Sequence, residues 1–174
     1  MIEEPTIRCF FGIPLEDLRE IIEIQNSMTG WPFKMTDPDN LHMTILFLGD
    51  RKMSDIDGII SKMKGIQFKI PEFIVKSIIG LPRNSHARVL ALSVSGVGLN
   101  KIYKKASEIS KYTEKKEFLP HITIGRSKKP VSLNRSWTEK RLDLKLSVNR
   151  ISLIRSDLTP DGPVYTELSS NYFI

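Results

Sequence analysis

The sequence contains a single cysteine and no apolar run long enough to cross a membrane. Because the lone Cys9 cannot close an internal disulfide, a reducing, intracellular compartment is favoured. Residues 1–5 are acidic and lack the basic flank and apolar stretch of a secretory signal. These absences argue against a disulfide-stabilised secreted domain and against a membrane protein. They predict a cytoplasmic location and no membrane partner.

Histidine is scarce as well, since the chain has only His42, His86 and His121. The sequence has no HExxH motif, no paired cysteines and no carboxylate cluster beside a histidine. Metal sites are usually built from such groupings. We therefore expect a protein that works without a metal ion and without a cofactor.

The composition is that of an ordinary globular protein, with 40% hydrophobic and 26% charged residues among 174. No low-complexity segment or long linker divides the chain, so residues 1–174 are expected to form one domain. The formal net charge is +6. A basic surface favours an anionic partner such as a nucleic acid or a nucleotide, although a solvated surface accounts for this excess equally well.

Helical and strand-like patterns are interspersed along the chain. Apolar spacing predicts helices over residues 15–28, 55–63 with Ser54 as N-cap, 99–111 and, as a short segment, 136–142. Strands are predicted over residues 7–11, 41–48, 68–79, 89–95, 121–125 (ended by the Lys128-Lys129-Pro130 segment), 145–157 with a kink near Asn149, and 164–173. A tight turn at residues 159–162 joins the last two strands. This arrangement predicts an α+β fold with antiparallel pairing.

Two predicted strands carry the same short pattern, a histidine and a threonine two residues apart with an apolar residue after each. Residues two apart in a strand project from the same face. His42 and Thr44 would therefore point one way from the first strand, as would His121 and Thr123 from the second. If the two strands lie side by side, all four groups can converge on one small anion.

Phosphoester chemistry has a use for such a set. Opening a cyclic phosphodiester with water requires one group that takes a proton from the nucleophile and another that gives a proton to the leaving oxygen. Imidazole titrates near pH 6.5, so one neutral and one protonated histidine can coexist near neutrality. Threonine hydroxyls can donate hydrogen bonds to the phosphate oxygens as charge develops.

The sequence around these pairs resembles the two-histidine (2H) phosphoesterase superfamily, and within it the RNA 2',3'-cyclic phosphodiesterase family, historically named 2'-5' RNA ligase. The resemblance covers nearly the whole chain. It is carried by residues 8–11, 40–49 and 118–126, and by the C-terminal pattern of Leu153, Ser156, Leu158, Gly162 and Tyr165.

This resemblance implies a bilobal α+β fold, with two antiparallel β-sheets and flanking helices related by pseudo-twofold symmetry around a central groove. It implies catalysis by His42 and His121, with Thr44 and Thr123 holding the phosphate. The expected reaction converts an RNA-terminal 2',3'-cyclic phosphate to a 2'-phosphate, and some members join tRNA halves through a 2'-5' linkage in reverse. We expect a monomer that acts on such RNA ends or nucleotides.

Several roles stay open at the level of sequence. Extending the family's usual assignment makes His121 the general base and His42 the acid, but reversal of the reaction exchanges these roles. Alternative functions are a phosphodiesterase for another cyclic or 2'-5'-linked nucleotide, and an RNA or nucleotide phosphate-binding module without turnover.

The residues beyond the motif also have two interpretations each. Arg126 follows Thr123 by three residues and would face away in an ideal strand, but a bulge at Gly125 could turn it toward the phosphate. A structural ion pair is the equal alternative for Arg126. Lys128 and Lys129 could meet flanking phosphates or simply be solvated. The aromatic residues that could stack on a base or pack in the core are Trp31, Phe33 and Phe47.

Overall fold

The computed structural model describes residues 2–174, and the strands in this part of the chain pair into one nine-stranded antiparallel sheet. Its order is β7-β4-β5-β6-β3-β1-β8-β9, with β2 pairing beside β6. The strands are β1 (Thr6–Pro14), β2 (Lys34–Met35), β3 (His42–Lys52), β4 (Glu72–Leu81), β5 (Ala87–Val97), β6 (His121–Val131), β7 (Leu144–Lys145), β8 (Arg150–Thr159) and β9 (Gly162–Tyr172). The helices are α1 (Arg19–Ser27), α2 (Met53–Lys64), α3 (Leu99–Ser110) and α4 (Arg135–Thr138), with 3-10 turns at Pro38–Asn40 and Asn84–His86.

The sheet has two halves that meet in the middle. One half contains β3, β1, β8 and β9, and the other contains β6, β5, β4 and β7. Within the described residues, β3 and β6 are joined by the single backbone pair of Met43 with Ile122. The predicted α+β, antiparallel fold is confirmed. The two expected sheets are joined into one at this junction, because β3 of one half pairs with β6 of the other.

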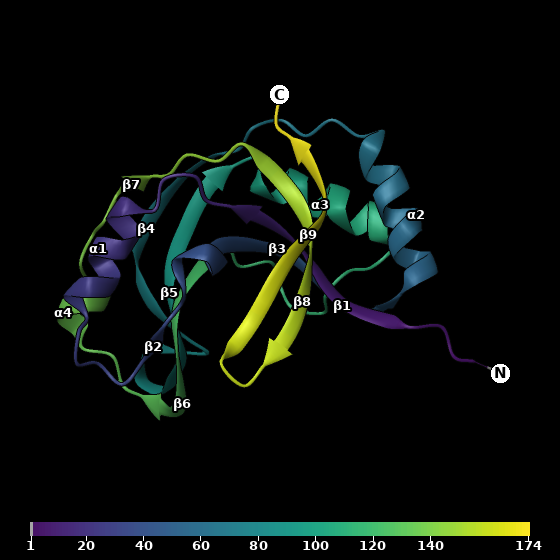
Figure 1. Ribbon diagram of the computed structural model, residues 1–174. Coiled ribbons are helices and arrows are strands. Elements are labelled where there is room, and N and C mark those ends of the chain that lie inside the picture. Colours follow the sequence, from purple (N-terminus) through teal and green to yellow (C-terminus); the bar gives the residue numbers. More distant parts are fainter. Residues whose placement is uncertain (1) are drawn as a thin grey trace.

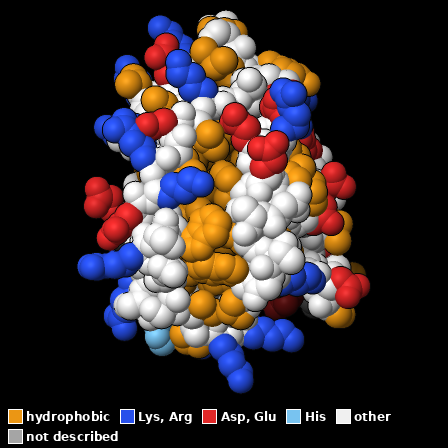
Figure 2. All heavy atoms as spheres, turned by 90° about the vertical axis from the view of Figure 1, so that its left-hand side faces the viewer, with side chains coloured by type: hydrophobic (Ala, Val, Ile, Leu, Met, Phe, Trp, Pro, Cys, Tyr) orange, Lys and Arg blue, Asp and Glu red, His pale blue; other side chains and the backbone are white. Residues whose placement is uncertain are grey.

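Helices flank the two halves on opposite sides (Figure 1). Helices α1 and α4 lie on the side of β4 and β7, while α2 and α3 lie on the side of β3 and β9. Figure 2 shows the face carrying α1 and α4, where a band of hydrophobic side chains runs between polar ridges and charged groups gather at the periphery. No helix within residues 2–174 has the length and apolar character needed to cross a membrane.

Three helices differ from the prediction, and the short one predicted over residues 136–142 is α4, which ends at Thr138. Helix α1 begins at Arg19 instead of residue 15, because the preceding backbone is engaged elsewhere: the N–H of Glu16 donates to the carbonyl of Ser147 at 3.0 Å. Ser54 does not cap α2 with its side chain, since the helix already begins at Met53. The N–H of Ser54 instead donates to the Glu4 carboxylate at 2.6 Å, so a distant acidic residue satisfies this end of the helix.

Several strand boundaries also differ: β1 and β3 continue to Pro14 and Lys52, and β4 covers Glu72–Leu81 instead of residues 68–79. Strand β6 does not end at Gly125 but continues to Val131, because the basic segment with Pro130 forms an irregularity between two paired stretches and needs no ladder hydrogen bond there. The kink predicted near Asn149 is a break, with β7 ending at Lys145 before β8 begins. The closing hairpin of β8 and β9 is confirmed.

Candidate active site

The two histidine–threonine pairs lie on adjacent antiparallel strands and on the same face of the sheet. Between each histidine and its threonine is a fully buried residue, Met43 on β3 and Ile122 on β6, and these two residues pair with each other. The residues that flank them are partly exposed on the opposite face, and these are His42, Thr44, His121 and Thr123. Extending the register by one residue on each side sets His42 opposite Thr123, and Thr44 opposite His121.

Both imidazoles are held in the same way. The Nδ1 atom of His42 lies 2.7 Å from the carbonyl oxygen of Asn40, and Nδ1 of His121 lies 2.7 Å from that of Leu119. Because a carbonyl oxygen only accepts, Nδ1 must carry a proton in each ring. The reactive Nε2 atom is therefore left for other partners, and in His42 it lies 2.9 Å from the hydroxyl of Thr44.

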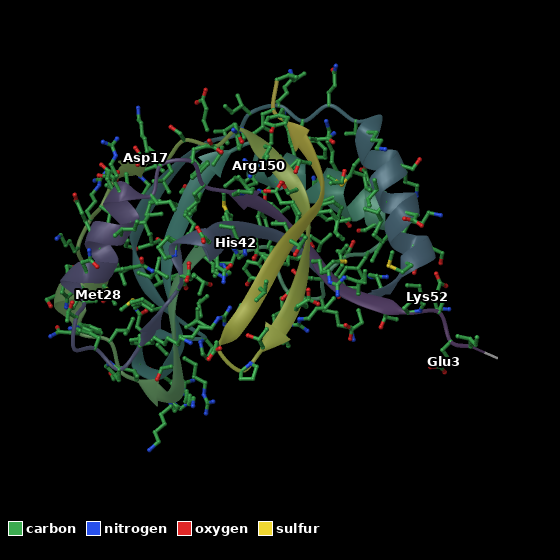
Figure 3. All side chains as sticks on the ribbon, viewed as in Figure 1. Glu3, Asp17, Met28, His42, Lys52 and Arg150 are labelled. Atoms are coloured by element: carbon green, nitrogen blue, oxygen red, sulfur yellow. The ribbon has the colours of Figure 1, made fainter. Side chains whose placement is uncertain are left out.

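The surroundings of His42 are aromatic and enclosed. Its ring lies 4.9 Å from that of Phe10 and 5.1 Å, edge-to-face, from that of Tyr165. Figure 3 shows His42 near the middle of the molecule, beside the β8–β9 hairpin. Burial, with smaller contributions from the charges of Arg126 and His121, lowers the pKa of His42 from 6.5 to about 4, although the hydrogen bond to Asn40 raises it. His42 is therefore neutral near pH 7 in the free protein.

A β-bulge brings Arg126 to the same side as Thr123. The register between β6 and β5 shifts at Ile124, which is the extra residue. Its carbonyl accepts hydrogen bonds from the N–H of Thr36 at 2.9 Å and from the buried side-chain amide of Gln25 at 3.0 Å. The same amide donates to the Thr36 carbonyl at 2.9 Å, so Gln25 ties α1 to the bulge.

These groups open onto a cavity of about 930 Å³. His42, Thr44, Thr123 and Arg126 line it, so the structure brings four of the five predicted site residues to one cavity. His121 is not part of the lining. It is placed beside the cavity by its register opposite Thr44, and its charge acts on His42.

Sequence reasoning assigned no role to three residues that the structure places at this cavity. Arg8 and Phe10 on β1 and Tyr165 on β9 all line it. The available signal was the two-residue spacing of Arg8 and Phe10, which puts both side chains on one face of a strand. Tyr165 could not be placed there from spacing, because its strand pairs with β8 rather than with the strands of the motif.

The other candidate residues divide into one that lines the cavity and several that do not. Phe47 lines the cavity beneath the guanidinium of Arg8, 4.4 Å from its ring centroid. Phe33 is buried, and Trp31 packs edge-to-face on another tryptophan. Lys128 and Lys129 are exposed and lie outside the cavity lining. Of the three aromatic candidates, Phe47 alone offers a ring to this cavity within the described residues.

Known proteins share both the sequence and the fold. Residues 12–89 match the family model described as LigT like Phosphoesterase. The chain is 34% identical to an RNA 2',3'-cyclic phosphodiesterase of Aquifex aeolicus, over 80% of this chain and 81% of that protein. It is 29% identical to one of Methanocaldococcus jannaschii, over 91% of this chain and 96% of that protein.

The structural likeness agrees. TT0787 of Thermus thermophilus superposes with a TM-score of 0.78 at 24% identity, covering 96% of this chain and 98% of that chain. E. coli LigT complexed with 3'-AMP gives 0.76 at 21% identity, covering 97% and 99%. The fold, with a histidine–threonine strand in each half of the sheet, defines a 2H phosphoesterase. The chain belongs to the LigT-like phosphoesterase family.

Proposed function

We propose that this protein hydrolyses RNA-terminal 2',3'-cyclic phosphates to 2'-phosphates by general acid–base catalysis without a metal ion. One observation carries the proposal: the paired strands set each histidine opposite the threonine of the other strand, and His42, Thr44 and Thr123 line one cavity. Residues 1–174 act as one bilobal domain. The relatives named RNA 2',3'-cyclic phosphodiesterase supply the substrate class.

In this proposal the two Nε2 atoms exchange protons with the substrate. His121 takes a proton from water as the water oxygen attacks phosphorus, and His42 gives a proton to the leaving 3'-oxygen of the ribose. The bond between phosphorus and that oxygen breaks, which leaves the 2'-phosphate. Because His42 is neutral in the free protein, it must take up a proton when the substrate binds. A neighbouring phosphate charge favours the imidazolium and raises the pKa of His42.

The remaining groups hold the phosphate. The hydroxyls of Thr44 and Thr123 donate to its non-bridging oxygens, and Arg126 adds a charge-assisted hydrogen bond. Donors fixed on a strand do not need to reorganise during the reaction, which is why such groups contribute strongly to the rate.

We further propose that the protein acts in the cytoplasm as a monomer on RNA ends or nucleotides, tRNA halves among them. Joining such ends through a 2'-5' linkage is the reverse of the same chemistry and uses the same residues. The same residues would also serve to cleave another cyclic or 2'-5'-linked nucleotide. A phosphate-binding module without turnover is disfavoured, because binding alone does not require two imidazoles presenting Nε2.

The test uses the full chain in EDTA with an oligoribonucleotide that ends in a 2',3'-cyclic phosphate. The expected product is the 2'-phosphate, identified by its resistance to a 3'-nucleotidase. Binding without turnover would favour the binding module instead. Comparable or faster turnover of 2'-5' oligomers would redirect the proposal to that substrate.

A further inference from the structure

Arg8 is held in a way that is unusual for an arginine. It is half-buried on β1, its guanidinium lies over the ring of Phe47, and its Nε is buried. Within residues 2–174, Nε has no hydrogen-bond partner and Arg8 forms no ion pair. Five other arginines each pair with a carboxylate: Arg19, Arg135, Arg141, Arg150 and Arg155.

A buried Nε–H without a hydrogen-bond partner costs free energy in the free protein. Arg8 also lines the cavity that holds the histidine–threonine pairs. The ring of Phe47 covers one side of the guanidinium. Its terminal N–H groups remain as the binding surface, and such groups match two oxygens of a phosphate.

Arg8 and Arg126 occupy different parts of the cavity. Arg126 follows the second motif on β6, whereas Arg8 lies over Phe47, three residues beyond Thr44 along β3. Three residues of a strand span about 10 Å. Burial raises the pKa of Tyr165, and the charges of Arg126 and Arg8 both lower it. Of these two arginines, only Arg126 lowers the pKa of His42. Arg8 therefore provides a positive group at a position separate from that of Arg126.

We propose that Arg8 binds the internal phosphodiester immediately 5' of the terminal nucleotide, so that the preferred substrate is an RNA chain rather than a free cyclic nucleotide. This inference rests on the proposed function and names its substrate class. The cavity volume of about 930 Å³ is near the upper end of the roughly 300–1,000 Å³ typical of small-molecule sites, which leaves room beyond one phosphate.

The experiment compares three ligands, two of which differ only in the charge of the internal phosphate. They are a nucleoside 2',3'-cyclic phosphate, a dinucleotide with the same cyclic end, and that dinucleotide with a neutral methylphosphonate as its internal linkage. The kcat/KM of the wild-type protein should be about 10- to 100-fold higher for the charged dinucleotide than for the other two, the range expected of a charge-assisted contact. Dissociation constants for the matching 2'-phosphate products should follow the same order.

Substitution then assigns the preference to a residue. Arg8→Gln should remove most of the preference, chiefly by lowering kcat/KM for the charged dinucleotide. Arg155→Gln is the matched control, because it removes one arginine charge from the neighbouring strand β8, where Arg155 pairs with Asp157 outside the cavity lining. This control should keep the full preference.

The outcomes separate the two proposals. A wild-type protein that turns over none of the cyclic ends refutes the proposed function, and product binding still decides the role of Arg8. Equal treatment of the charged and methylphosphonate dinucleotides would overturn the phosphate contact. So would an Arg8→Gln variant that keeps the preference, or one that loses binding of all three products equally.

Discussion

The two halves of the sheet present the same histidine–threonine pair in different surroundings. Each Nδ1 is bound to a carbonyl two residues earlier, so the backbone fixes the same tautomer twice. On β3, however, His42 is enclosed by Phe10 and Tyr165 and bonded to Thr44. Strand β6 carries Arg126 three residues after its threonine, where β3 carries Phe47. The comparison teaches that equal motifs can have unequal surroundings, because residues from other strands enclose His42 and burial lowers its pKa.

Removing either imidazole is the strongest test of the shared motif. His42→Ala and His121→Ala should each lower kcat by about 10²- to 10⁴-fold, the usual contribution of a positioned acid or base. Steady-state turnover of the cyclic end measures this. His86→Ala is the control, because His86 ends an exposed turn and should have no effect. Full activity in either of the first two variants would contradict the two-histidine mechanism.

The hydroxyls should matter less than the imidazoles but to a similar extent on both strands. Thr44→Val and Thr123→Val each remove one donor to the phosphate, and each should lower kcat by about 10²-fold. Thr44→Ser and Thr123→Ser keep a hydroxyl and should retain most of the activity. If the valine variants match the wild type, the threonines only pack the strands.

Disturbing the bulge on β6 should have a smaller effect, which falls on KM and not on kcat. Gln25→Met keeps the volume of the side chain but removes the donor to the Ile124 carbonyl, so Arg126 should be less well placed. We expect a roughly tenfold rise in KM with little change in kcat. In the double variant with Arg126→Ala, the loss should equal that of Arg126→Ala alone, since both act through one contact. Additive losses would show that Gln25 acts through general stability instead.

The enclosure of His42 predicts a pH effect with a defined sign. Its folded-state pKa of about 4 lies below the unfolded value of 6.5, so the unfolded chain binds the proton more readily. This contribution to stability is present above pH 6.5 and is lost as the pH falls toward 4, by up to about 3 kcal/mol. Urea unfolding at several pH values measures the slope, and His42→Asn should flatten it. An equal slope in the variant would rule out His42 as its source.

Much of this arrangement could be predicted from the sequence, because it depends on local periodicity. The alternation of apolar residues with His42, Thr44, His121 and Thr123 fixes which face each side chain takes, and the structure has that pattern. The bulge that redirects Arg126 was only one of two interpretations, because it depends on hydrogen bonds to Ile124 from Thr36 and Gln25, about ninety to a hundred positions away.

Non-local contacts set the remaining features. The ring of Tyr165 reaches His42 only through the pairing of β9 with β8 and of β8 with β1, and no local pattern encodes that path. Likewise, the early start of α2 depends on Glu4, fifty residues from Ser54. Spacing identified the chemistry, and tertiary contacts enclose His42 and lower its pKa.

Imidazole nitrogen NMR during titration with a nucleoside 2'-phosphate tests most directly whether one phosphate engages both rings. The Nε2 resonances of His42 and His121 should move together with one dissociation constant, while both Nδ1 atoms keep their protons on the backbone carbonyls. A response confined to one ring, or two different dissociation constants, would contradict the shared site.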